Sequence, residues 1–177
     1  MENNKYNNED LNDQENKAEE AEKVTVLDDK VRSGKAEDLC RWAAARAGVI
    51  VVAPLVGTAA LLANEVYLII KLGKVYEQKI TETTAVSILG SLGTMFVGQT
   101  IATLIPFAPM QIPIAVGTTY GLGRVVTEWL KSGKPEDLSA FKTVYNEAVK
   151  EAKQNLSSFK NNAKKDDPLG DESKKFK

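Results

Sequence analysis

The chain contains no histidine and only one cysteine among its 177 residues. Without histidine it lacks the side chain that most often serves as a general base, a metal ligand or a pH switch near neutrality. A single cysteine forms no disulfide within the chain and supplies no thiolate cluster for zinc or iron–sulfur. These absences argue against most enzymes, and Cys40, with no histidine to activate it, is expected to be a packed thiol.

Several binding motifs are absent as well. The sequence has no GxxxxGK[ST] phosphate loop and no basic face interleaved with aromatic residues. The acidic residues of the central region are spread over different segments, at Glu65, Glu77, Glu82 and Glu128. We therefore expect no catalytic residues, no cofactor, no metal site and no nucleic-acid partner.

Charge divides the chain into three parts. Residues 1–40 carry a net charge of −6, residues 41–133 of +3 and residues 134–177 of +2. Residues 1–22 are rich in Asn, Glu and Asp, and such a segment buries too little apolar surface to offset its ordering entropy. We expect disordered tails at residues 1–22 and 161–177 on either side of one helical domain at residues 23–160. The first tail also lacks the apolar run of a signal peptide.

Two windows without any charge mark the centre of the chain. Ala47–Asn64 has 18 residues and Thr83–Gly123 has 41. The first is interrupted by Pro54 and Gly57, so we expect two helices there, at about residues 36–52 and 55–78. The second is long enough for two bilayer crossings or for one buried helical hairpin.

The second window has a natural turn at Pro106, Pro109 and Pro113. Proline removes a backbone donor and disfavours helix at the residue before it. The pattern predicts a hydrophobic hairpin at about residues 84–130, with arms Thr84–Ile105 and Ile112–Leu130. The first arm is long enough to span a bilayer, whereas the second meets charged residues at 124 and 128. Three alternatives stay open: the hairpin spans, inserts part-way, or packs inside a soluble bundle.

The charges around the hairpin favour a membrane. The tip has none, and the open end carries Lys71, Lys74 and Lys79 on one side and Arg124, with Lys131 and Lys134, on the other. By the positive-inside rule, both termini would lie in the cytoplasm and the tip would point into the bacterial cytoplasmic membrane. A cytoplasmic location is the alternative. Trp42 and Tyr67 fit either interfacial aromatics or ordinary core packing.

Small residues recur at helical spacing in both arms. Gly90, Thr94 and Gly98 are four residues apart, and so are Gly117 and Gly121. Small residues at this spacing permit two helix backbones to approach closely. The arms are expected to pack against each other through these residues, or against a second copy in a homo-oligomer.

The last part of the domain reads as an amphipathic helix over residues 135–160. Gly133 suits the position after a helix end, and Pro135 suits the first position of the next helix. Apolar residues then recur every three or four positions: Leu138, Phe141, Tyr145, Ala148, Ala152, Leu156 and Phe159. The whole chain is therefore expected to be all-α, with about five helices.

The stretch from about Pro54 to Gly133 resembles the DUF697 family. The residues that carry the resemblance are 65–76, the small-residue segment 85–105, the proline turn, Gly117–Gly123 and Trp129–Gly133. The resemblance implies a helical, membrane-associated domain that often follows an Era-like GTPase domain. This chain departs from the family in two ways. Glu77 stands where the family tends to have glycine, and the chain has no GTPase domain. Because of the second departure, the resemblance implies at most a separate GTPase as partner.

The sequence thus predicts a non-enzymatic, membrane-associated anchor or adaptor on the cytoplasmic face of the membrane. Two alternatives remain. One is a soluble helical interaction module whose hairpin is its core. The other is a pore-forming or membrane-perturbing protein that everts the hairpin.

Overall fold

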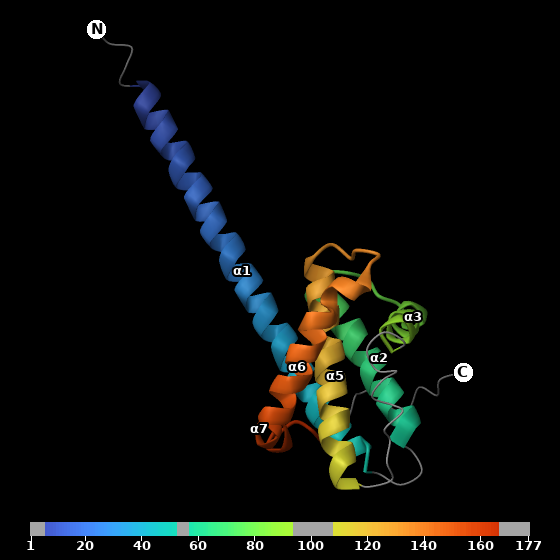
Figure 1. Cartoon of the computed structure of the whole chain (residues 1–177). Helices are drawn as coiled ribbons and strands as arrows, with labels where there is room; N and C mark the ends of the chain where they lie inside the picture. Colours follow the sequence, from blue (N-terminus) through green and yellow to red (C-terminus); the bar gives the residue numbers. More distant parts are fainter. Residues whose placement is uncertain (1–5, 53–56, 94–107, 167–177) are drawn as a thin grey trace. The chain divides into compact units, whose positions relative to one another are not determined.

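The computed structural model describes residues 6–52, 57–93 and 108–166 of the chain (Figure 1). Within those ranges the regular structure is entirely helical, without a strand. This confirms the predicted all-α fold. The chain divides into two compact units, Met1–Lys35 and Ala36–Lys177, and each is described by itself.

The first unit contains the beginning of helix α1 (Tyr6–Ile50). Its side chains from Glu22 to Val31 are exposed, and Arg32 forms an ion pair with Asp28 at 2.8 Å. Where the sequence predicts a disordered tail to residue 22 and a helix start near residue 36, α1 begins at Tyr6. The reason is local propensity, because Glu, Gln, Lys and Ala in this segment are strong helix formers even where little apolar surface is buried.

The second unit is a bundle in which α5 (Ala108–Lys131) packs against three other helices. These are residues 36–50 of α1, α2 (Gly57–Val75) and α6 (Lys142–Gln154). The short helix α3 (Glu82–Leu92) packs on α2 and not alongside α5. Residues 94–105 of the expected first arm lie outside the described residues, so the packing of the two arms of the hairpin stays a prediction.

Small residues bring α5 close to its neighbours. A Cβ atom added at Gly123 would lie 2.6 Å from Cys40 Sγ on α1, and one added at Gly121 would lie 2.8 Å from the Tyr145 ring on α6. At Gly117 the nearest side-chain atom belongs to Val149 of α6, at 3.3 Å. The small-residue face of α5 thus packs on α6.

The remaining residues of the predicted small-residue face do not extend this packing. No atom lies within 4 Å of a Cβ built at Gly90, which is exposed. Thr94 and Gly98 lie outside the described residues. The described chain therefore gives no second glycine face for Gly117 and Gly121 to meet.

Two of the three prolines predicted in the turn, Pro109 and Pro113, lie within α5. Pro113 lies inside α5 instead of in a turn, and Pro109 is the second residue of the same helix. Pro106 lies outside the described residues. Proline is tolerated near a helix start because the first N–H groups have no partner within the helix, and Pro113, in the second turn, removes only one hydrogen bond.

The C-terminal helix of the prediction is divided in the structure. Gly133 does follow the end of α5, with φ of +77°, and Lys134 N donates to Trp129 O at 2.9 Å, as in a Schellman cap. Asp137 then caps the 3₁₀ helix η2 (Leu138–Phe141), so Pro135 is not the first residue of a helix. A turn at Asn155 separates α6 from α7 (Leu156–Lys160).

None of the helices within the described ranges has the length and apolar character needed to cross a membrane. In particular, α5 carries Arg124 and Glu128 in its second half. Among the described residues, no helix therefore qualifies as the membrane span considered for the predicted hairpin.

The end of α2 places Glu77 in the left-handed region, with φ of +56°. Gln78 N donates to Gly73 O at 2.7 Å and Glu77 N donates to Lys74 O at 3.2 Å. This is the hydrogen-bond pattern of a Schellman cap, in which glycine is the favoured residue. Glu77 therefore holds a backbone conformation that is unfavourable for a residue with a Cβ atom.

We expect Glu77→Gly to raise the free energy of unfolding by about 0.5–1 kcal/mol, because relief of the left-handed strain exceeds the greater entropy of the unfolded chain. Urea unfolding of the full chain measures the change. Glu77→Ala is the control, since it removes the carboxylate but keeps the Cβ atom. A gain in the alanine variant as large as in the glycine variant would contradict the prediction.

Candidate functional site

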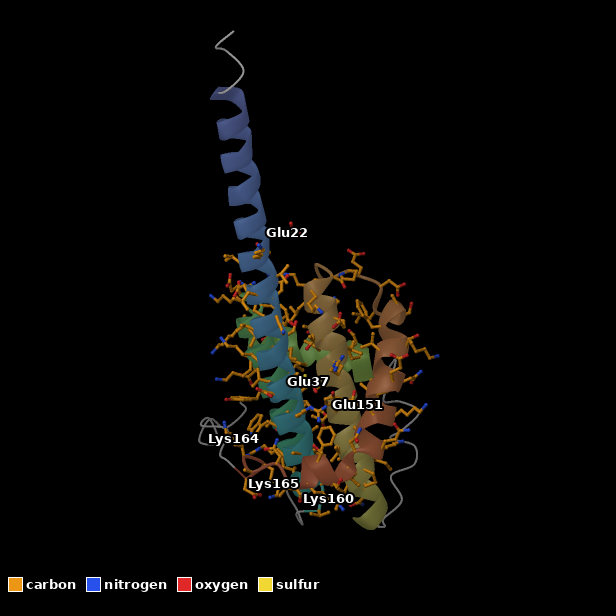
Figure 2. The ribbon with its side chains drawn as sticks, turned by 90° about the vertical axis from the view of Figure 1, so that its left-hand side faces the viewer. Glu22, Glu37, Glu151, Lys160, Lys164 and Lys165 are labelled. Atoms are coloured by element: carbon orange, nitrogen blue, oxygen red, sulfur yellow. The ribbon has the colours of Figure 1, made fainter. Side chains whose placement is uncertain are left out.

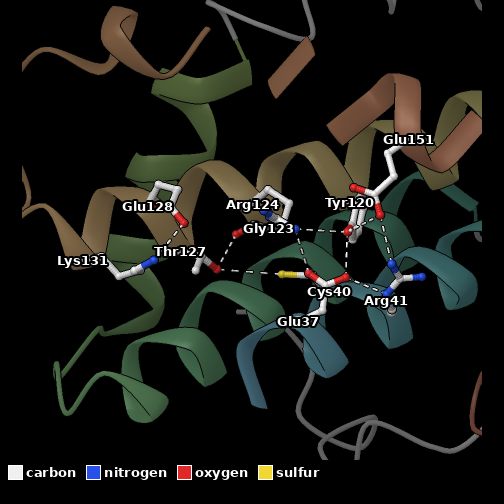
Figure 3. A network of polar contacts seen from close by, with 10 residues as sticks. All are labelled: Glu37, Cys40, Arg41, Tyr120, Gly123, Arg124, Thr127, Glu128, Lys131 and Glu151. Atoms are coloured by element: carbon white, nitrogen blue, oxygen red, sulfur yellow. Dashed lines mark hydrogen bonds and ion pairs between the residues drawn. The ribbon is translucent and has the colours of Figure 1, made fainter. Parts of the chain in front are cut away.

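The most elaborate polar arrangement in the described chain joins three helices at the middle of the bundle (Figure 3). Glu37 and Arg41 come from α1, Tyr120 and Arg124 from α5, and Glu151 from α6. Residues four apart lie on the same face of a helix, so each of the first two helices presents a pair of side chains to the others. We call these five residues the charged cluster.

Glu37 is the centre of the charged cluster. Its Oε1 accepts from Arg41 Nε at 2.6 Å and from the Tyr120 hydroxyl at 2.7 Å, and its Oε2 accepts from Arg124 Nη1 at 3.0 Å. Glu151 Oε1 accepts from Arg41 Nη2 at 2.9 Å and lies 3.1 Å from the Tyr120 hydroxyl. Two guanidinium groups thus face two carboxylates, and the formal charges balance.

Aromatic rings complete the cluster. The Cζ atoms of Arg41 and Arg124 lie 5.7 and 5.9 Å from the centroid of the Tyr120 ring. Phe159 of α7 is buried, meets Tyr120 edge-on at 5.2 Å, and lies 5.5 Å from Arg41 Cζ. Cation–π contacts of this kind add to the ion pairs. The cluster therefore also fixes the short C-terminal helix on the bundle.

The tyrosine and the two arginines of the charged cluster stay protonated through neutral pH, because their pKa values are raised. Burial, followed by the hydrogen bond to Glu37, raises the pKa of the Tyr120 hydroxyl. Burial alone would lower the pKa of Arg124, but its hydrogen bond with Tyr120 and the charge of Glu37 outweigh burial and raise it. The arrangement is suited to holding helices together by fixed charges, since none of these shifts brings a proton into exchange near neutrality.

The Cys40 thiol is buried beside the cluster. Its Sγ lies 3.9 Å from Thr127 Oγ1, and the Thr127 hydroxyl donates to Gly123 O at 2.9 Å. Burial raises the pKa of Cys40 to about 12, so the thiol stays protonated and poorly nucleophilic. This confirms the expectation of a packed thiol.

A second polar group is buried between α1, α2 and α5. Asn64 Nδ2 donates to the Ala43 carbonyl at 3.0 Å, and the Thr119 hydroxyl donates to Glu65 Oε1 at 3.2 Å. Burial raises the pKa of Glu65 to about 7, against the smaller opposing effect of the hydrogen bond from Thr119. The Glu65 carboxyl is therefore the group in this region whose charge changes near neutral pH.

A shallow hollow of about 220 Å³ adjoins the charged cluster between α5 and α6. Arg124 and Glu151 of the cluster line it together with Glu128 and Glu147. Glu128 accepts from Lys131 at 3.2 Å. Within the ranges that the structure describes, no three cysteine or acidic side chains are grouped so as to hold a metal ion.

The cations predicted at a membrane interface separate into two groups. Lys74 and Lys79 are exposed, and Lys71 Nζ lies 5.0 Å from the Tyr67 ring centroid. Arg124, by contrast, belongs to the charged cluster, because its partner is Glu37 and not Glu128 four residues away. It therefore joins helices inside the bundle.

Most of the charged cluster is not predicted by the sequence. A usable signal was present, because Glu37 and Arg41 are four residues apart and are followed by the buried alanines 43, 44, 45 and 47. An ion pair on the edge of an apolar helix face often pairs with charges on a facing helix. No pattern in the sequence, however, indicates that Glu151, 110 residues after Arg41, is its second partner.

Comparison of the chain with protein-family models, with curated proteins and with solved structures gave no match. The resemblance to the DUF697 family therefore stays a prediction.

We expect Tyr120→Phe to lower the free energy of unfolding by about 1–2 kcal/mol, because the hydroxyl contacts both carboxylates of the charged cluster inside the bundle. Denaturant unfolding followed by circular dichroism measures the loss. Tyr76→Phe is the matched control, since the buried Tyr76 hydroxyl makes no hydrogen bond to the described residues. Equal losses in the two variants would show that the cluster contributes no specific stability.

The raised pKa of Glu65 predicts a pH dependence of stability. The folded state binds this proton more tightly than the unfolded chain, whose pKa is near 4.5. The contribution of Glu65 is thus most favourable below pH 4.5 and declines as the pH rises to about 7, by at most about 3 kcal/mol. Unfolding of the wild type, of Glu65→Gln and of the exposed control Glu147→Gln at pH 5 and pH 8 measures it. If Glu65→Gln leaves the difference between the two pH values unchanged, the prediction is wrong.

Proposed function

We propose that this chain is a non-enzymatic helical adaptor that attaches to the cytoplasmic face of a membrane by one end of its bundle. In this proposal the bundle docks on the membrane without crossing it, and the remaining surface is available for a protein partner. A separate GTPase as that partner is supported only by the resemblance to the DUF697 family.

The observation that carries the proposal is one end of the bundle at which α1, α2 and α5 carry no charge. Gly48 of α1 packs on Ile112 and Val116 of α5, and Glu65 of α2 meets Thr119 of α5. These contacts place the end of α1, the start of α2 and the start of α5 at the same end of the bundle. No residue among 47–64 or 108–123 is charged. We call this the uncharged end.

The uncharged end also exposes apolar side chains. Val49, Val52 and Leu62 are 39%, 45% and 45% exposed. Burial of such side chains in the interfacial region of a bilayer stabilises attachment in proportion to the apolar area removed from water. At the opposite end the same region of the bundle is charged, because Lys134 of the loop after α5 donates to Gln78 after α2 at 2.8 Å and Lys74, Lys79 and Lys131 are exposed.

A second candidate function is an interaction module that has no contact with a membrane. The enclosure of α5 favours it, because α5 is covered by α1, α2 and α6 and holds Arg124 in the charged cluster. Eversion of α5 into a bilayer, as a pore-forming protein requires, would break these ion pairs. The two candidates differ in whether the uncharged end meets lipid.

Flotation of the purified full-length chain with phospholipid vesicles tests the proposal. We expect the wild type to float with the vesicles and Val49→Asp with Leu62→Asp to reduce the bound fraction at least tenfold. The control is Val24→Asp with Leu27→Asp, which alters two side chains that are equally apolar and 63% exposed in the first unit. Failure of the wild type to float would overturn membrane attachment and favour the interaction module, provided that circular dichroism shows the helices intact.

A further inference from the structure

A group of basic side chains lies beside the uncharged end, next to an indole ring. Trp42 Nε1 donates to the backbone oxygen of Lys164 at 2.7 Å, so the segment after α7 runs against α1. Arg46, one turn further along α1, places its Cζ 5.8 Å from the Trp42 ring centroid. We call Arg46, Lys160 and Lys164, with Trp42, the basic collar.

We propose that the basic collar binds the headgroups of anionic phospholipids when the uncharged end docks on a bilayer. This inference rests on the proposed membrane attachment and adds to it the class of lipid that is recognised.

The fold fixes the position of the collar lysines. Lys160 follows Phe159, which is 1% exposed and packs on Tyr120 of the charged cluster. The backbone of Lys164 is held in place because its carbonyl oxygen accepts a hydrogen bond from the Trp42 indole. Both lysine side chains are exposed, and Figure 2 shows them with Lys165 near the lower end of the bundle. Their backbone is thus anchored while their ammonium groups reach into solvent.

The height of the collar matches the depth of an interfacial contact. Trp42 lies eight residues before Ile50, the last residue of α1, which is about 12 Å along the helix axis. Interfacial segments insert about 5–10 Å into the boundary between headgroups and acyl chains. An uncharged end inserted to that depth brings Trp42, and Lys164 held against it, close to the level of the phosphate groups, where Trp and Lys are favoured.

Within the part of the chain that the structure describes, three acidic groups near the collar form ion pairs. Glu37 and Glu151 pair with Arg41 and Arg124 in the charged cluster. Asp166 pairs with Lys165 at 3.2 Å. Among the described residues, Lys160 and Lys164 therefore add positive charge at this level of the bundle, which complements an anionic surface.

The type of residue favours lipid headgroups over an acidic protein. Lysine presents a hydrated point charge on a flexible stem and suits a fluid array of phosphates, whereas arginine forks suit fixed carboxylates. The collar has two exposed lysines, and its arginine lies over an indole ring. The apolar side chains of the adjacent uncharged end complete a surface that is basic above and apolar below, as at a bilayer interface.

The test compares vesicles of phosphatidylcholine alone with vesicles that contain 30% phosphatidylglycerol, using the full-length chain. We expect at least tenfold tighter binding to the anionic vesicles at 0.1 M salt. The double variant Lys160→Gln with Lys164→Gln should lose roughly 30-fold of its affinity for anionic vesicles, since each lysine near such a surface contributes about fivefold. Lys74→Gln with Lys142→Gln is the matched control, because it removes the same charge at the opposite end of the bundle.

The outcomes separate this inference from the proposed function. Equal binding of the wild type to both kinds of vesicle would overturn the inference and leave membrane attachment standing. Equal losses in the collar and control variants would overturn it too, because only net charge would then matter. Binding to neither kind of vesicle would overturn both proposals. The inference is supported if the collar variant loses the preference for anionic vesicles and the control variant keeps it. Higher salt should weaken the preference of the wild type for anionic vesicles.

Discussion

The close approach of two helices to α5 is the constraint on which the rest of the bundle depends. At Gly123 and Gly121 a single added carbon would collide with Cys40 of α1 and with Tyr145 of α6. Only at this short separation do the side chains of Glu37 and Glu151 both reach Tyr120 and the arginines. The glycine contacts and the charged cluster therefore support each other, since the contacts set the distance and the ion pairs fix the register.

This packing also explains the distribution of charge over the second unit. The arginines and glutamates near the middle of the bundle are used to join helices, so they do not add net charge to its surface. The uncharged residues of α1, α2 and α5 meet at one end, and α2 and α5 carry exposed lysines at the other. The two ends of the bundle therefore differ in charge, and this difference is the physical basis for the proposed docking of one end on a membrane.

Local features were the most predictable from the sequence, and partners in space were the least. The sequence predicts the cap at Gly133 correctly because the role of this residue depends on adjacent residues only. It predicts Pro113 in a turn, whereas α5 begins earlier and tolerates proline in its second turn. Gly117 and Gly121 were recognised as a packing face, but their partner is α6, which the spacing of small residues does not specify.

The sequence by itself determined the helical class, the uncharged segments, the packed state of Cys40 and the ends of several helices, because periodicity, composition and capping act over a few residues. Tertiary structure alone decided that Arg124 pairs with Glu37, that Glu151 completes the cluster, and that Lys164 lies against Trp42. These contacts join residues 87 to 122 positions apart. They depend on which helix faces pack together, a choice made by the sum of many apolar contacts over the whole bundle.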